Sequence, residues 1–313
     1  MSDWKILLTD GLEENGKIIL AKEAQVDDKK GVTAEELLKI IGDYDAIIVR
    51  GRTKVTKEVF EAGKKLKVVG RSGVGVDNID LQAAKEHKVI VVNAPIATTR
   101  AVAELVLGMI FALAREIPRA DSSMKQNQWL KKEFEGVELN GKTLGVIGIG
   151  RIGSNVAKMA SAIGMKILAY DPVLSPEAIR TAGGEVSALD ELLQKADFIT
   201  IHTPLTDSTR NMVNATMLAK MKDGVRIICA ARGNIIDEAA LLTALNSGKV
   251  AGVALDVFST EPPVDSELAK HPKIVATPHI GGQTVEAQIR AANDISNEVL
   301  ATLHGAPLHW KVA

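Results

Sequence analysis

The sequence has little cysteine, almost no net charge and no long apolar run. Each of these absences excludes a class of protein. Its one cysteine, Cys229, excludes an internal disulfide and fits a reducing compartment. A formal net charge of −1 argues against nucleic acid or an anionic membrane as the main partner. The longest apolar run, residues 105–114, is too short to span a bilayer, and the first residues lack the basic and apolar stretches of a signal peptide. We therefore predict a cytoplasmic globular protein that binds neither nucleic acid nor membrane.

What the chain does contain is an alternation of short Ile- and Val-rich runs with helical patterns, which predicts parallel sheets. The length of 313 residues favours two domains. A first series of strands reads KILLTD, DAIIVR, KVVGRSG and VIVVNAP; a second reads TLGVIGIG, KILAYD, FITIHTP, VRIICAAR, VAGVALDVF and KIVATP. A long helix over 98–117, stopped by Pro118, precedes a polar stretch that leads to the second series, and a last helix covers 286–305. The predicted fold class is α/β with two doubly wound parallel-sheet domains.

The second series opens with a glycine motif, Gly148-x-Gly150-x-x-Gly153, between an apolar strand and a helix. A second strand follows and ends in Asp171, 18 residues after the last glycine, and this full context is typical of a dinucleotide site. The glycines allow a tight turn and close approach of the pyrophosphate, and the helix N-terminus attracts its charge. Asp171 suits the adenosine ribose hydroxyls and would repel a 2′-phosphate, so NAD is favoured over NADP.

Polar residues at the carboxyl ends of the second-series strands are the candidates for chemistry, because ligands bind there in open α/β sheets. They are His202, Thr203, Arg232, Asp256, Glu261 and His279. If the chain transferred hydride from a 2-hydroxy acid to NAD, it would need a proton acceptor, a planar cation for the carboxylate and an acid that orients an imidazole. Spacing does not choose between His202 and His279 as the proton acceptor. Asp256 as a strand-end cap and an Arg232–Glu261 structural ion pair are the alternatives, and His279 has no metal-ligand spacing, so no metal is expected.

Motifs along nearly the whole chain resemble those of the D-isomer-specific 2-hydroxyacid dehydrogenases. They include GRSGVGVDNID, LNGKTLGVIGIGRIG, HTPL, ARG, ALDVFSTEPP and TPHIGG, in this order. The resemblance implies a Rossmann NAD-binding domain, a flavodoxin-like substrate-binding domain and the catalytic set Arg232, Glu261 and His279. It implies cofactor contacts at Gly148, Gly150, Arg151, Ile152, Gly153, Asp171, His202, Thr203, Pro204, Ala230, Ala231, Arg232, Asp256, His279, Gly281 and Gly282. Asn234, Cys229 and Val74 depart from residues that are common in the family at these positions.

The same resemblance implies a substrate site and an activity. Its residues are Arg50, Arg71, Ser72, Gly73, Val74, Arg232 and His279, with Lys131 or Lys132 as further cations, although each basic residue alone is typical of a solvated surface. The expected reaction is NAD-dependent oxidation of 3-phospho-D-glycerate, the first step of serine synthesis. Another D-2-hydroxyacid dehydrogenase, such as a glyoxylate or hydroxypyruvate reductase, and a non-catalytic NAD-sensing protein are the alternatives.

The resemblance also divides the chain. Residues 1–95 are expected to form the substrate-binding domain, to which residues 284–313 return, and 96–283 the NAD-binding domain. The helix over 98–117 is expected at the core of a homodimer interface, with burial inside one domain as the alternative. Because the sequence ends at Ala313, soon after the last helix, we expect a form without the C-terminal regulatory domain that some family members carry.

Overall fold

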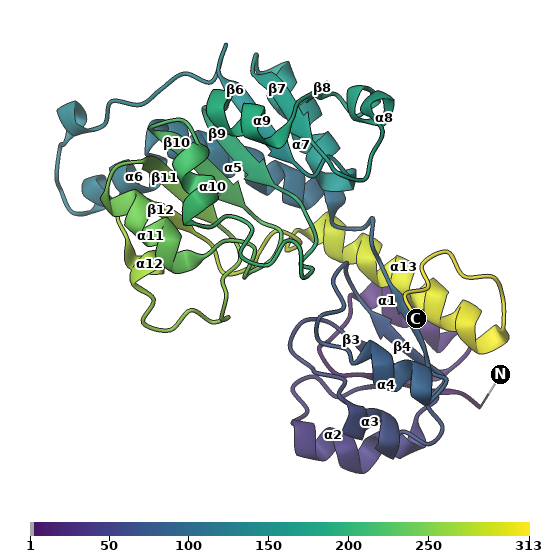
Figure 1. The fold of residues 1–313 in the computed structure, drawn as a ribbon. Coiled ribbons are helices and arrows are strands. Elements are labelled where there is room, and N and C mark those ends of the chain that lie inside the picture. Colours follow the sequence, from purple (N-terminus) through teal and green to yellow (C-terminus); the bar gives the residue numbers. More distant parts are fainter. Residues whose placement is uncertain (1–2) are drawn as a thin grey trace. The chain divides into compact units, whose positions relative to one another are not determined.

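The computed structural model describes residues 3–313 and folds them into two compact units (Figure 1). The first unit holds the residues up to Thr99 together with Gly282–Ala313, and the second holds Arg100–Gly281. Each unit is built on one sheet, and every strand pair within the two sheets is parallel. The predicted fold class is confirmed.

The first unit contains a five-stranded sheet in the order β2-β1-β3-β4-β5. Its strands are β1 (Lys5–Leu8), β2 (Gln25–Asp28), β3 (Ala46–Val49), β4 (Val68–Arg71) and β5 (Ile90–Asn93). Its helices are α1 (Glu14–Ala21), α2 (Ala34–Ile40), the 3₁₀ turn η1 (Ile41–Asp43), α3 (Lys57–Ala62), α4 (Leu81–Glu86) and α13 (Val285–His304). This strand order is that of flavodoxin-like folds.

Side chains that alternate along these strands build two apolar layers, one on each face of the sheet. Leu7, Ile47 and Val69 pack with residues of α2, α3 and α4. Ile6 and Ile48 pack with residues of α13, which lies against α1, β4 and β5. The two helical layers therefore bury both faces of the sheet, which fits strands that are apolar along almost their whole length.

The second unit contains a seven-stranded sheet in the order β12-β11-β10-β9-β6-β7-β8. Its strands are β6 (Thr143–Ile147), β7 (Lys166–Tyr170), β8 (Glu185–Val186), β9 (Phe198–Ile201), β10 (Val225–Cys229), β11 (Val250–Leu255) and β12 (Ile274–Ala276). Its helices are α5 (Thr99–Arg115), α6 (Ile117–Lys125), η2 (Lys131–Glu133), α7 (Arg151–Ala162), α8 (Pro176–Thr181), α9 (Leu189–Lys195), α10 (Ala215–Lys220), α11 (Glu238–Asn246) and α12 (Glu267–Lys270). This order has the Rossmann arrangement, in which the first strand lies between the second and the fourth.

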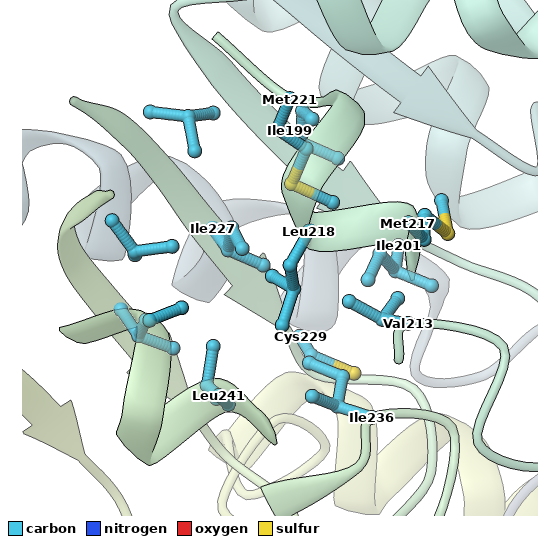
Figure 2. Packing of buried hydrophobic residues seen from close by; sticks show 14 of the residues in the cluster. Ile199, Ile201, Val213, Met217, Leu218, Met221, Ile227, Cys229, Ile236 and Leu241 are labelled. Atoms are coloured by element: carbon cyan, nitrogen blue, oxygen red, sulfur yellow. The ribbon is translucent and has the colours of Figure 1, made fainter. Parts of the chain in front are cut away.

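Two apolar clusters cover this sheet. One joins its strands to α9, α10, α11 and α12, and Figure 2 shows Ile199, Leu218, Ile227 and Cys229 interleaved within it. The other joins the opposite face to α5, α7 and α8. Most of the apolar side of α5 is buried in this second cluster, so the helix packs chiefly within its own unit.

The structure differs from the sequence prediction at the long helix. The helix α5 ends at Arg115 because Glu116 adopts a left-handed conformation (φ 50°), and Pro118 lies in the first turn of a new helix, α6. The helix α6 and the strands β2 and β8 were not predicted. No helix within residues 3–313 is long and apolar enough to cross a bilayer.

Each sheet has one pair of neighbouring strands from which the chain continues towards opposite sides of the sheet. In open α/β sheets, ligands bind outside the carboxyl ends of the strands at such a switch point. In the second unit this point lies between β6 and β9. In the first unit it lies between β1 and β3.

Candidate functional site

The turn after β6 is shaped for a phosphate group. Gly148 has φ 86° and the chain enters α7 directly at Arg151, with Gly150 as the N-cap. A Cβ atom at Gly153 would lie 2.2 Å from the Gly148 carbonyl oxygen, so only glycine permits this approach of helix and turn. Since the first N–H groups of a helix lack partners within the helix, the N-terminus of α7 is suited to an anion.

Asp171, which follows β7, holds this turn through its carboxylate. Its Oδ2 accepts from the N–H of Ile149 (3.1 Å), and its Oδ1 accepts from the N–H groups of Val173 (2.9 Å) and Leu174 (3.2 Å). An ionised carboxylate has about four acceptor positions, so capacity remains for ribose hydroxyls.

Two further features at this turn fit a dinucleotide. The hydroxyl oxygen of Thr203, just after β9, is buried and has no hydrogen-bond partner within residues 3–313. A hollow of about 640 Å³ adjoins the turn and is lined by residues of α7 and α8 and by their N-caps, among them Gly150, Arg151, Ser154, Lys158 and Ser175. A buried hydroxyl without a partner is costly unless a ligand or water satisfies it, so the residues present fit a polar ligand such as NAD.

His202 lies beside Thr203 but is not arranged as a proton acceptor. Its Nε2 forms a hydrogen bond with the Thr200 hydroxyl (2.9 Å). Burial lowers the pKa of His202 to about 4, so the ring is neutral near pH 7. No carboxylate in the described part of the chain pairs with it.

Two of the predicted site residues, His279 and Glu261, are joined by a hydrogen bond between their side chains. The distance from His279 Nδ1 to Glu261 Oε2 is 2.7 Å. Glu261 Oε1 accepts from the Phe258 N–H (3.1 Å), which fixes the carboxylate. His279 has φ 54°, a left-handed backbone conformation that is uncommon for residues other than glycine. Residues in such conformations cluster at active sites.

Asp256 holds the turn that carries His279. Its Oδ1 accepts from the Thr277 hydroxyl (2.6 Å) and the Ile280 N–H (2.7 Å), and its Oδ2 accepts from the Gly281 N–H (2.8 Å). The residue is only 1% exposed. Its predicted contact with the cofactor stays a prediction, while its contact with this turn is seen directly.

Arg232 stands in the turn after β10, which packs against the segment that carries Glu261. A Cβ atom at Gly233 would lie 1.9 Å from the Phe258 carbonyl oxygen, so glycine is required for this contact between the two turns. Asn234 adopts φ 62°, which asparagine tolerates, and donates to the Ser259 carbonyl (3.3 Å). The departure at Asn234 therefore leaves a well-connected turn, in which Arg232 Nη1 donates to the Ala231 carbonyl (2.6 Å).

The predicted substrate residues of the first unit lie at the carboxyl ends of β3 and β4. Arg50 follows β3 and donates from Nη2 to Gln283 Oε1 (3.3 Å). Arg71 ends β4, and its Nη1 would lie 1.6 Å from a Cβ atom at Gly73, so its guanidinium lies across the loop that begins at Ser72. In the second unit, Lys131 and Lys132 are exposed in η2.

Sequence reasoning missed three residues that contact Arg50: Asp10, Asn78 and Gln283. Asp10 could have been found, because it follows the first strand of its series and the rule on carboxyl ends of strands applies there too. Asn78 and Gln283 carry no comparable signal. No group of three or more His, Cys, Asp or Glu residues within 3–313 is arranged to hold a metal ion.

Comparisons with known proteins identify the family of the chain. Residues 107–281 match the family described as D-isomer specific 2-hydroxyacid dehydrogenase, NAD binding domain. The chain is 48% identical over 303 residues to D-3-phosphoglycerate dehydrogenase of Synechocystis sp., covering 97% of this chain and 55% of that protein. It is 48% identical over 302 residues to the enzyme of the same name from Methanocaldococcus jannaschii, covering 96% and 58%. The chain thus spans little more than half the length of these relatives.

Solved structures give the same result over whole chains. A glyoxylate reductase from Paecilomyes thermophila has a TM-score of 0.90 at 32% identity and covers 100% of this chain and 99% of that one. A D-lactate dehydrogenase from Aquifex aeolicus, complexed with NAD and lactic acid, has a TM-score of 0.83 at 31% identity and covers 96% of each chain. The protein therefore belongs to the D-isomer-specific 2-hydroxyacid dehydrogenase family, and residues 107–281 match its NAD-binding domain.

Proposed function

We propose that the protein oxidises 3-phospho-D-glycerate to 3-phosphohydroxypyruvate with NAD. The observation that carries this proposal is the hydrogen-bonded pair of His279 and Glu261. The pair follows strands of the same parallel sheet as the dinucleotide turn, at their carboxyl ends. The choice of substrate is supported by two relatives named D-3-phosphoglycerate dehydrogenase, each 48% identical to this chain.

When bound, NAD supplies the acceptor for the hydride that leaves the substrate carbon. His279 takes the hydroxyl proton. Because the Glu261 carboxylate accepts from Nδ1, the other ring nitrogen, Nε2, is left to act as the base. The negative charge of Glu261 then stabilises the protonated ring. Such a positioned base contributes roughly 10²–10⁴-fold to the rate.

Arg232 binds the substrate carboxylate, since a guanidinium matches a carboxylate with two parallel hydrogen bonds. The contact of Gly233 with Phe258 supports this role, because it joins the turn of Arg232 to the segment of Glu261. In the first unit, the N–H groups of the loop at Ser72–Val74, with the Arg71 guanidinium lying across it, suit a carboxylate as well. Arg50 is assigned to the phosphate.

A panel of acids and cofactors tests this function. We expect kcat/KM for 3-phospho-D-glycerate with NAD to exceed that for D-glycerate and D-lactate at least about tenfold, the value of one charge-assisted contact. Equal values for 3-phosphoglycerate and D-glycerate would replace this reading with a general D-2-hydroxyacid dehydrogenase. Tight NAD binding without turnover of any acid, including glyoxylate and hydroxypyruvate in the reverse direction, would favour the NAD-sensing alternative.

We also infer that the protein acts as a homodimer in the cytoplasm. The buried single cysteine is compatible with a reducing compartment. Apolar side chains stay exposed along α5, α6 and the segment that follows, namely Phe111 (40%), Ile117 (52%), Met124 (54%) and Trp129 (77%). Exposed apolar patches mark interaction surfaces. Sedimentation should give a dimer that Trp129→Ser and Met124→Ser together dissociate; a monomer at all concentrations would refute this inference.

A further inference from the structure

The carboxyl ends of β1 and β3 meet at the point in the first unit where the order of its strands reverses. Such points are where open α/β sheets bind ligands. Asp10 comes two residues after β1, and the loop at 50–53 begins directly after β3. This loop carries two arginines, Arg50 and Arg52, and Asp10 contacts both of them.

Asp10 holds the loop through four donors. Its Oδ2 accepts from the N–H groups of Arg50 (2.7 Å) and Thr53 (3.1 Å), while its Oδ1 accepts from the Thr53 hydroxyl (2.6 Å) and lies 3.1 Å from Arg52 Nη2. The side chain of Asp10 is only 4% exposed. Burial alone would raise the pKa of Asp10, but hydrogen bonds from Thr53 and Arg50, with the charge of Arg52, lower it overall. The carboxylate therefore stays ionised at neutral pH.

Asn78 fixes the same loop from its carbonyl side. Its amide nitrogen donates to the carbonyl oxygens of Arg50 (3.0 Å) and Thr53 (2.6 Å). The backbone of Arg50 is thus held at its N–H by Asp10 and at its C=O by Asn78. Two hydrogen bonds on one residue leave its backbone little freedom. The direction in which the Arg50 side chain leaves the backbone is therefore fixed.

The two arginines of the loop differ in what surrounds their charge. Arg52 donates to the carbonyl oxygens of Thr9 (2.7 Å) and Val32 (3.0 Å) and is paired with Asp10. The side chain of Arg50 donates to the neutral amide of Gln283, and no carboxylate within residues 3–313 pairs with it. The positive charge of Arg50 is therefore not compensated by a carboxylate of the described residues, whereas Asp10 compensates that of Arg52.

We propose that Asp10, with Asn78, is a positioning residue that presents Arg50 as the phosphate-binding cation of the first unit and withholds Arg52 from that role. This inference rests on the proposed function, because it assigns the residue that recognises the terminal phosphate of the substrate. Gln283 supports the guanidinium from the side with a neutral acceptor, which orients it without neutralising its charge.

The test is Asp10→Asn with Asp45→Asn as a matched control. Asp45 lies at the amino end of β3, where it accepts from the Lys5 N–H (3.1 Å) and pairs with Lys67 (3.1 Å), so its substitution removes a backbone hydrogen bond and an ion pair away from the loop. An amide at position 10 puts an NH₂ group against donors and loses the ion pair. We expect Asp10→Asn to raise KM for 3-phospho-D-glycerate at least about tenfold, the scale of a misplaced binding group. KM for D-glycerate and the affinity for NAD should not change, and Asp45→Asn should leave all three constants as they are.

A second pair of variants decides the matter if Asp10→Asn fails to fold. Arg50→Met should raise KM for 3-phospho-D-glycerate roughly ten- to a hundredfold, the value of one charge-assisted contact, while Arg52→Met raises it far less. The thermal midpoint of each variant separates instability from misplacement. An equal or larger effect of Arg52→Met, or an unchanged KM ratio in a folded Asp10→Asn, would overturn the inference. Equal KM values for both acids in the unaltered protein would instead refute the proposed function.

Discussion

Asp10, Asp171 and Asp256 each follow a strand and accept hydrogen bonds from backbone N–H groups of a nearby turn. Hydrogen bonds to an ionised carboxylate are stronger than hydrogen bonds between neutral groups, so a single aspartate can hold the conformation of a turn. The side chains that do the proposed chemistry, Arg50 and His279, stand on the turns that Asp10 and Asp256 hold. At this scale, the proposed function depends on aspartates that hold the turns on which the proposed site residues stand.

Asp171 gives a prediction about the cofactor. Its carboxylate would repel the 2′-phosphate of NADP, so Asp171→Ala should narrow the preference for NAD, chiefly by weakening NAD binding about tenfold or more, as expected for lost hydrogen bonds to a charged group. Titration of both cofactors by protein fluorescence measures this directly. Equal affinity for NAD and NADP in the unaltered protein would show that Asp171 does not select the cofactor.

The proposed catalytic residues were only partly predictable from single positions. The rule on carboxyl ends of strands gives His202 and His279 equally, and only the family resemblance selects His279. What separates them in the structure is tertiary: His279 has Glu261 at 2.7 Å, whereas His202 has the Thr200 hydroxyl. Asn78 and Gln283 act through contacts between segments far apart in sequence, and no local pattern marks such contacts.

At the scale of elements, the strand–helix–strand unit β6–α7–β7 shows how closely a sequence motif and a structure agree. An apolar strand, three glycines, a helix and a second strand followed by an acid were all recognisable. The strands β2 and β8 were missed because they lie at the edges of their sheets and carry few buried apolar residues. The helix α6 was missed because Pro118 was taken as the end of the preceding helix, and of the nine residues of α6 only Ser123 is buried.

The contact of α7 with its preceding turn gives a prediction at this scale. A methyl group at Gly153 would lie 2.2 Å from the Gly148 carbonyl oxygen, so Gly153→Ala must push the helix from the turn. Overpacking of this kind costs about 1–3 kcal/mol in the free energy of unfolding. NAD affinity, measured by calorimetry, should fall at the same time, because the first N–H groups of α7 move.

Gly108 in α5 supplies the matched control for this substitution. A methyl group there meets no atom within 4 Å apart from the backbone of its own helix and its chain neighbours, and alanine favours a helix over glycine by about 1 kcal/mol. Gly108→Ala should therefore keep or raise the free energy of unfolding and leave NAD affinity unchanged. Equal behaviour of the two alanine variants would contradict the role given to Gly153.

At the scale of the whole molecule, stability should depend on pH through His202. The pKa of His202 is lowered to about 4, against a usual value of 6.5 that holds in the unfolded chain. Between these values the unfolded chain binds a proton that the folded protein does not, so acid favours unfolding. The free energy of unfolding should thus fall as the pH drops from about 6.5 towards 4, with no contribution from His202 above that window.

Denaturant unfolding across this pH range, on the unaltered protein and on His202→Gln, measures the effect. Glutamine does not titrate and keeps a group that can bond to Thr200, so its curve should fall less steeply than that of the unaltered protein. Parallel curves for the two proteins would mean that His202 is as easily protonated in the folded state as in the unfolded chain.

The most direct test of the proposed chemistry is the single-turnover rate at which NADH forms from 3-phospho-D-glycerate, measured for the unaltered protein, His279→Gln and His202→Gln. Removal of a positioned base should slow this step roughly 10²–10⁴-fold in His279→Gln, with NAD affinity nearly unchanged. His202→Gln should retain most of the rate, since His202 bonds to Thr200 and has no acid beside it. A rate in His279→Gln close to that of the unaltered protein, or a larger loss in His202→Gln, would contradict the assignment of His279 as the base.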